Sequence, residues 1–205
     1  LLKFNMIFDY NHYNIDLKKL IKLSGLTKIN ILDFGCGKGI WDPVKMNNKN
    51  INKIILFDRE KKLINFLKKK YKTKKIKINF SYKNILKKEK YNTILFSSVI
   101  QYIEKKKLKK LIYDMVGNKN KKTFIFSDVP YMPRFFEFLL LPIVNLKRFI
   151  FVCKIIFNKK YKNLNYYRYK KDDFNIFKKD FKINFYSNMH DLKLLRYTVV
   201  LKTKQ

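Results

Sequence analysis

The sequence of 205 residues contains no alanine, five glycines, four prolines and two cysteines. So little glycine and proline excludes a collagen-like or low-complexity chain, and 47% hydrophobic with 17% aromatic residues predicts a folded protein. Cys36 and Cys153 are far apart and lie in no Cys-x-x-Cys or Cys/His cluster, which argues against a zinc site or a disulfide framework. The first residues lack the pattern of a signal peptide. We therefore expect no bound metal and a reducing, cytoplasmic environment.

Acidic residues are also scarce, because 15 Asp and Glu face 48 Lys and Arg, for a formal net charge of +33. Such a charge indicates an anionic partner, either nucleic acid or a membrane surface. A second cause is the coding sequence, since 43 lysines against five arginines, with no alanine, are typical of an AT-rich gene. Base composition does not account for the few acids, so both causes stay open. A solvated lysine-rich surface is the ordinary alternative.

The order of apolar runs predicts one α/β domain over residues 1–205, since this length suits a single core. Residues 15–24 have the apolar spacing of an amphipathic helix that ends at Gly25. Short β-branched runs then alternate with lysine-rich segments of helical periodicity, which predicts a doubly wound parallel sheet. The predicted strands are Ile29–Phe34, Lys53–Phe57, Ile76–Phe80, Thr93–Phe96 and Thr123–Ser127, and the clearest helices are Glu60–Lys70 and Glu104–Val116.

The pattern changes after the fifth predicted strand. A helix-like segment, Lys171–Lys179, precedes two strands, Lys182–Tyr186 and Arg196–Lys202, which we expect to form an antiparallel hairpin that completes a mostly parallel, seven-stranded sheet. Residues 130–169 fit no strand–helix repeat and are interpreted as an insertion. Charged residues and Pro142 interrupt its apolar segments, so no run of about 20 apolar residues exists for a membrane span. The insertion suits a lid over a substrate pocket or a surface making peripheral membrane contact.

The most informative segment is Ile31–Gly39, in which glycines follow a buried strand. Gly35, Gly37 and Gly39 allow the backbone to turn sharply and to approach a ligand without obstruction by side chains. The dinucleotide-binding pattern requires glycine at the first, third and sixth places, but the sixth place is Ile40. The spacing therefore predicts a ligand-binding turn and argues against a pyrophosphate site.

This loop resembles motif I of the class I, Rossmann-like S-adenosylmethionine-dependent methyltransferases. In that family an acidic residue stands two places before the first glycine, as Asp33 does here. The resemblance implies that Asp33 and the loop residues Gly35, Cys36, Gly37 and Gly39 hold the amino-acid half of S-adenosylmethionine.

Two later segments extend the resemblance. The family places an acid at the end of the second strand to bind both ribose hydroxyls, and Asp58, followed by Arg59, ends the run Lys53–Phe57. After the third strand the family commonly has an Asp or Asn that binds the adenine amino group. Asn84 matches that position, which implies that Ile85 packs on the adenine ring. The loop and Asp58 are the specific part of a resemblance that covers roughly residues 15–130 and 170–203.

The segment after the fourth strand resembles the family less closely. Ser97 and Gln101 match residues that line the cofactor pocket, whereas Asn92 stands where the family commonly has Asp. Ordinary structural roles stay open for several of these residues: Ser97 can satisfy backbone groups at a strand end, Asn84 can form a turn, and Cys36 can be a small packing residue in the loop.

Methyl transfer from a sulfonium is an in-line displacement with a neutral leaving group, so alignment in a dry site matters more than acid–base catalysis. For a hydroxyl acceptor, Asp128 at the end of the fifth strand and His190 in the closing hairpin are candidate bases. The motifs of base amino and base C5 methylation are missing after the fourth strand. We expect a methyltransferase acting on a small molecule or biosynthetic intermediate, saccharides and lipid-linked compounds included. An RNA methyltransferase and a non-catalytic binding protein of the same fold are the alternatives.

Overall fold

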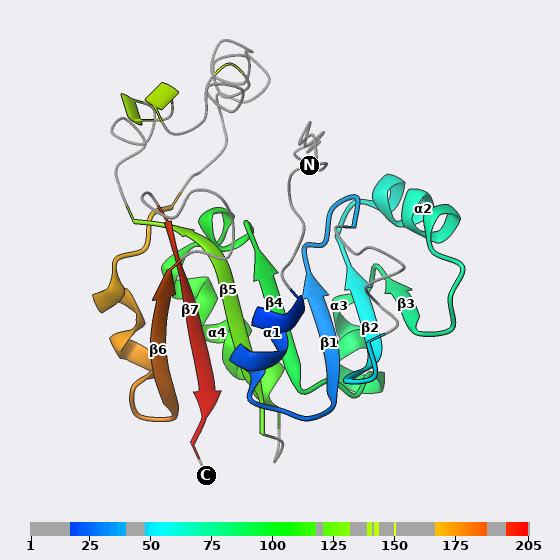
Figure 1. The fold of residues 1–205 in the computed structure, drawn as a ribbon, viewed down its shortest axis with the longest axis horizontal. Helices are drawn as coiled ribbons and strands as arrows, with labels where there is room; N and C mark the ends of the chain where they lie inside the picture. The colour runs from blue at the N-terminus through cyan, green and yellow to red at the C-terminus, as the bar shows by residue number, and fades with distance from the viewer. Residues whose placement is uncertain are drawn as a thin grey trace.

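A computed structural model describes residues 17–39, 48–117, 121–131, 139–140, 142–143, 150, 167–187 and 196–204. Its centre is a seven-stranded sheet with the order β3-β2-β1-β4-β5-β7-β6 (Figure 1). The strands are β1 (Ile29–Phe34), β2 (Ile51–Phe57), β3 (Ile76–Asn79), β4 (Thr93–Ser97), β5 (Thr123–Pro130), β6 (Phe181–Ser187) and β7 (Arg196–Thr203). The helices are α1 (Leu17–Ser24), α2 (Lys61–Lys70), α3 (Tyr82–Lys88) and α4 (Lys105–Val116), with the 3-10 helices η3 (Ile100–Tyr102) and η5 (Lys171–Phe177).

Strands β1 to β5 pair in parallel, and β7 pairs antiparallel with both β5 and β6. This confirms the predicted α/β fold: a doubly wound, mostly parallel seven-stranded sheet of the Rossmann-like class that ends in antiparallel strands. Each predicted strand is present with ends shifted by at most three residues. The largest shift is at β5, which continues to Pro130, the residue at which the insertion was predicted to begin.

Three short elements differ from the sequence-based expectation. Lys171–Phe177 is a 3-10 helix, and α3 and η3 were not predicted. Helices of three to seven residues contain too few turns to show a periodicity of 3.6, so tertiary contacts decide them. In α3, for example, the helix begins where the Ser81 side chain accepts a hydrogen bond from the Asn84 amide.

Helices cover both faces of the sheet and create two cores. On one face α1 and α2 contribute Leu20, Leu23, Ile64 and Leu67. The opposite face is covered by α3, α4 and η5, which contribute a second set of buried side chains: Ile85, Leu108, Ile112, Met115, Phe174 and Phe177. Figure 1 shows α1 in front of the sheet and α3 and α4 behind it. Strands buried on both faces explain why the sequence of β1, β4 and β5 is almost continuously apolar.

A row of phenylalanines crosses the four central strands close to their carboxyl ends. Phe57 of β2 contacts Phe34 of β1 with ring centroids 4.8 Å apart, Phe34 contacts Phe96 of β4 at 5.0 Å, and Phe96 stacks on Phe126 of β5 at 4.8 Å. All four side chains are buried in the core shared with α3 and α4. Aromatic pairs at these distances add to the stabilisation from area burial. The packing of this row therefore fixes how far each of the four strands extends toward the carboxyl edge of the sheet.

Asn92, where the resembled family commonly has Asp, joins the beginnings of β1 and β4. Its Oδ1 accepts a hydrogen bond from the Asn30 amide at 3.0 Å, and its Nδ2 donates to the Lys28 carbonyl at 3.1 Å. A carboxylate can accept but cannot donate, so it could not make the second bond. Asparagine at this position therefore makes a pair of hydrogen bonds that the aspartate of the family could not make.

The predicted insertion, residues 130–169, lies mostly outside the described residues, so the lid and the membrane-surface hypotheses stay predictions. Its two described ends lie side by side, because the Tyr169 amide donates to the Pro130 carbonyl at 2.9 Å. The Tyr169 hydroxyl also donates to the Ile103 carbonyl at 2.6 Å, and the Tyr197 hydroxyl donates to the Tyr169 carbonyl at 2.7 Å. Within the described ranges, no helix is long and apolar enough to cross a membrane.

Glu89, at the end of α3, connects two strands at the β3 edge of the sheet. Its nearly buried carboxylate forms ion pairs with Lys53 of β2 and Lys77 of β3. Burial alone would raise the pKa of Glu89, but hydrogen bonds from Lys53 and Lys77 and their charges outweigh it, so the pKa lies below its ordinary value of 4.5.

We expect Glu89→Gln to lower the free energy of unfolding by about 1–2 kcal/mol at pH 7, a modest value because both lysines are well exposed. A carboxyl with a lowered native pKa contributes stability above its unfolded pKa and loses it as the pH falls through the native value. The difference between wild type and variant should therefore shrink at acidic pH, below about 4.5. Urea denaturation of both proteins at several pH values measures this difference in unfolding free energy.

The control is Glu104→Gln, which changes the same charge in an exposed ion pair with Lys107 on α4. It should change stability far less than Glu89→Gln does, because solvent screens an exposed pair. Equal effects of the two substitutions would show that Glu89 acts only through net charge.

Candidate functional site

The predicted site residues Asp33, Gly35 and Asp58 lie at or just beyond the carboxyl ends of β1 and β2, the edge at which doubly wound sheets bind ligands. Register explains their proximity, because Phe34 of β1 pairs with Phe57 of β2. The Phe57 carbonyl then accepts hydrogen bonds from the amides of Gly35 at 2.8 Å and Cys36 at 3.0 Å. The glycine loop is thus attached directly to the neighbouring strand.

Asp58 connects this loop to the start of α2. Its Oδ2 accepts from the Gly37 amide and its Oδ1 from the Glu60 amide, both at 3.0 Å. Each carboxylate oxygen can accept a second hydrogen bond, so these contacts leave acceptor capacity on Asp58. The two sequence features that define the resemblance, 21 residues apart, are therefore bonded to each other.

The loop requires glycine for two reasons. Gly35, Gly37 and Gly39 all have positive φ angles, of 76°, 56° and 73°, a region that other residues rarely adopt. A Cβ on Gly35 would also lie 2.7 Å from Val99, and one on Gly39 would lie 2.7 Å from Tyr71. The loop is therefore in tight contact with the segment after β4 on one side and with the end of α2 on the other.

Lys70 holds the far end of the loop, a role that the sequence did not reveal. Its ammonium group donates to the carbonyls of Gly39 at 2.8 Å and Lys38 at 3.2 Å. Burial lowers the pKa of Lys70. Nothing distinguishes Lys70 from its lysine neighbours in the sequence, because only the close approach of α2 to the loop selects it.

Asp33 and Cys36 are both buried, with exposed fractions of 1% and 4%. Burial, followed by the negative charges of Asp33 and Asp58, raises the pKa of the Cys36 thiol well above its ordinary value. The thiol is therefore protonated at neutral pH and is a poor nucleophile. This agrees with a packing role for Cys36 in the loop.

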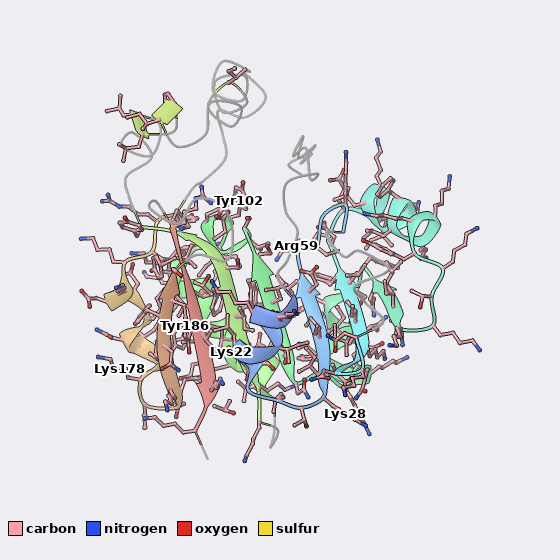
Figure 2. All side chains as sticks on the ribbon, viewed as in Figure 1. Lys22, Lys28, Arg59, Tyr102, Lys178 and Tyr186 are labelled. Atoms are coloured by element: carbon pink, nitrogen blue, oxygen red, sulfur yellow. The ribbon has the colours of Figure 1, made fainter. Side chains whose placement is uncertain are left out.

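The structure brings only some of the predicted adenine-site residues to this edge. Arg59 is exposed and lies at the upper edge of the sheet in Figure 2. Asn84 is exposed on α3, where its amide donates to Ser81. Ile85 is fully buried in the core shared with α4, so its packing on an adenine ring stays a prediction. Phe80, which follows β3 directly, is 55% exposed and was not singled out in the sequence.

Beyond β4, Ser97 ends the strand and Gln101 lies in η3. Gln101 is only 2% exposed, and its side-chain Oε1 has no hydrogen-bond partner among the described residues. The backbone carbonyl of Gln101 accepts from the Tyr167 amide at 2.7 Å, which attaches η3 to the segment that follows the insertion. A buried amide oxygen without a partner is costly in a folded protein, so it is a candidate contact for a ligand.

Asp128, the predicted base, lies at a β-bulge in β5 and is completely buried. Its Oδ2 accepts from the Ser98 hydroxyl at 2.6 Å and from the Arg196 guanidinium at 2.8 Å. Ser98 and Asp128 are also the two non-glycine residues with positive φ among the described residues, at 54° and 65°. Strain of this kind occurs mostly at functional sites. The sequence could have suggested Arg196, because arginine is rare in this chain, whereas for Ser98 it indicated only the satisfaction of backbone groups at a strand end. His190, the other predicted base, lies outside the described residues.

We expect Gly35→Ala to weaken binding of S-adenosylmethionine by at least about tenfold, because the new Cβ would displace Val99 and the loop. Gly117→Ala is a matched control, since Gly117 has a φ of 57° but nothing lies within 4 Å of a Cβ there. Both variants should lose about 1–3 kcal/mol of stability from backbone strain. Calorimetric titration with S-adenosylmethionine separates them, and equal affinities would contradict a cofactor role for the loop.

Comparison with known proteins agrees with this geometry. Residues 11–112 match the family model of the methyltransferase small domain. Magnesium protoporphyrin IX methyltransferase from Synechocystis PCC 6803, with bound S-adenosylhomocysteine, has a TM-score of 0.56 and 15% identity over 90% of this chain and 78% of that chain. N-methyltransferase NodS from Bradyrhizobium japonicum WM9 has a TM-score of 0.53 and 10% identity over 91% and 92%.

A putative S-adenosylmethionine-dependent methyltransferase from Listeria monocytogenes has a TM-score of 0.53 and 18% identity over 92% of this chain and 96% of that chain. A search of curated protein sequences gave no match. The family match, together with the sheet order and the bonded loop and acid, identifies the chain as a class I S-adenosylmethionine-dependent methyltransferase.

Proposed function

We propose that this enzyme methylates a small molecule or a biosynthetic intermediate, saccharides and lipid-linked compounds included. The observation that carries the methyl-donor site is the hydrogen bond between Asp58 and the Gly37 amide. Support for a small acceptor comes from two similar structures, whose names are magnesium protoporphyrin IX methyltransferase and N-methyltransferase NodS. The similarity to them is one of fold, so the acceptor itself is a proposal.

The residues present fit S-adenosylmethionine, which supplies an electrophilic methyl group when bound. Asp58 offers its remaining acceptor capacity to the ribose hydroxyls, and its contacts with two backbone amides hold the carboxylate in place. The glycines leave a surface without side chains against which the cofactor can lie. Asp33 is the candidate partner for the ammonium group, and Arg59 and Asn84 remain candidates on the adenine side.

The acceptor is expected above the ends of β4 and β5, next to the loop. There Ser97, Gln101 and Asp128 are the candidate contacts. The Asp128 carboxylate is buried and shared by Ser98 and Arg196, which favours a positioning role over proton transfer. Because the leaving group is neutral, methyl transfer can proceed by alignment alone in a site that excludes water. His190 remains a candidate base for a hydroxyl acceptor.

Replacing Asp58 tests the cofactor site. We expect Asp58→Ala to weaken S-adenosylmethionine binding at least about tenfold, since one hydrogen bond to a charged group contributes about 1.5–3 kcal/mol. Calorimetric titration measures the affinity, and circular dichroism checks the fold. Asp114→Ala, which removes an exposed acid on α4, is the control and should bind normally. Unchanged binding by Asp58→Ala would refute the assignment.

Replacing Asp128 tests the positioning role. Asparagine adopts positive φ about as readily as aspartate, so Asp128→Asn removes the charge and keeps the backbone. It leaves the Arg196 guanidinium buried without its counter-ion. We expect a loss of about 3–5 kcal/mol in unfolding free energy, with affinity for S-adenosylmethionine changed by less than about threefold. Urea denaturation measures the unfolding free energy, and calorimetric titration measures the affinity. An unchanged stability would contradict a structural role for the ion pair between Asp128 and Arg196.

A further inference from the structure

The positive charge of the chain is concentrated in one segment. Residues 61–90, which comprise α2, β3 and α3, contain 13 lysines and a single acid, Glu89. Lysine is therefore more than two residues in five here, against about one in five over the whole chain. An AT-rich coding sequence acts on every segment alike, so it does not account for this concentration.

The fold gathers these lysines at one end of the molecule. Strand β3 is an edge strand of the sheet, with α2 packed on one face and α3 on the other. Lysines from three elements therefore surround the same sheet edge. In Figure 2 nitrogen-tipped side chains extend outward from α2 and from the adjoining segment. We name the exposed face formed by α2, β3 and α3 the basic edge.

A comparison with α4 shows that dense lysine need not leave unbalanced charge. Lys105 of α4 forms an ion pair with Asp173 of η5, and Lys107 pairs with Glu104. At the basic edge the one acid, Glu89, is already shared by Lys53 and Lys77. One carboxylate cannot neutralise 13 ammonium groups, so this face attracts polyanions.

Aromatic rings are exposed among these lysines. Phe66, on the outer face of α2, is 45% exposed, and its helical neighbours are Lys62 four residues before it and Lys69 three residues after it. Phe80 at the end of β3 is 55% exposed. Rings on which bases can stack, next to cations that bind phosphates, are the combination used by proteins that bind single-stranded nucleic acid.

We propose that the basic edge binds single-stranded nucleic acid, with Phe66 as a stacking platform and the surrounding lysines as phosphate contacts. A membrane surface fits less well, because interfacial helices need a broad exposed apolar face. Apart from Phe66, the exposed side chains of α2 are polar or charged: Lys61, Lys62, Asn65, Lys68, Lys69 and Lys70. The binding surface is independent of methyl transfer, although Lys70 connects α2 to the glycine loop and so places the two sites close together.

Fluorescence anisotropy with the full chain tests the proposal. The probes are labelled oligouridine and oligodeoxythymidine of about 12 nucleotides and a duplex of the same length. The triple variant Lys62→Gln, Lys68→Gln, Lys69→Gln should bind the single strands at least about tenfold more weakly, and the slope of log affinity against log salt should fall by about 2. The matched control is Lys106→Gln, Lys109→Gln, Lys110→Gln on α4, which removes the same charge and should change affinity by less than about threefold.

Phe66→Leu keeps an apolar side chain but removes the ring, and it should weaken single-strand binding at least about fivefold. Asp58→Ala should bind the oligonucleotides as wild type does, so failure of the cofactor site and failure of the basic edge are distinguishable. Incubation with tritiated S-adenosylmethionine then reports whether the bound RNA is itself methylated.

Three results would overturn the proposal. Equal weakening by the two triple variants would mean that only diffuse net charge acts. Duplex binding as tight as single-strand binding, with no effect of Phe66→Leu, would exclude stacking. Flotation with phosphatidylglycerol vesicles without oligonucleotide binding would assign the basic edge to a membrane surface.

Discussion

The parallel pairing of Phe34 with Phe57 is the constraint on which the binding edge depends. It sets the heights of β1 and β2 so that the amides of Gly35 and Cys36 both reach the Phe57 carbonyl. The row of stacked phenylalanines extends the same alignment to β4 and β5. A shift of one residue would turn every side chain to the other face and separate the loop from its acid. Hydrophobic packing thus determines where the polar chemistry occurs.

The few acids of this basic chain act largely at points where elements meet. Asp58 joins the glycine loop to α2, Glu89 joins β2 to β3, and Asp128 joins the end of β4 to β7 through Ser98 and Arg196. On the outer surface Asp173 and Asp180 bind Lys105 and Tyr113 of α4. Because acids are scarce, lysines greatly outnumber the carboxylates available to them, and the basic edge is the largest result of that imbalance.

Backbone strain and several unsatisfied polar atoms occur around the ends of β4 and β5. Ser98 and Asp128, at the ends of neighbouring strands, both have positive φ and are bonded to each other. Within the described residues, the hydroxyls of Ser127 and Thr198, the Oε1 of Gln101 and the hydroxyl of Tyr82 on α3 are buried without hydrogen-bond partners. Each of these features costs stability, and such costs are usually tolerated where a protein acts on a ligand. The glycine loop and Asp58, by contrast, are bonded to each other.

Local patterns were sufficient to predict most of the framework. Strands buried on both faces require continuous apolar runs, and a ligand-binding turn requires glycine, so β1 to β5, the loop and Asp58 could all be read from the sequence. The order of the strands and the parallel crossovers then followed from the alternation of strand and helix. Short elements such as α3 and η3 were missed because their residues carry too little periodicity.

What the sequence by itself determined was the fold class and the methyl donor, because both depend on residues close together in the chain. Tertiary structure decided the rest: that Ile85 lies in the core with α4, that Lys70 binds the loop, and that Arg196 neutralises Asp128. These roles depend on contacts between residues 31 to 68 positions apart, and no local pattern encodes such contacts. Lysines that are indistinguishable in the sequence acquire separate roles only when the sheet brings them to one edge.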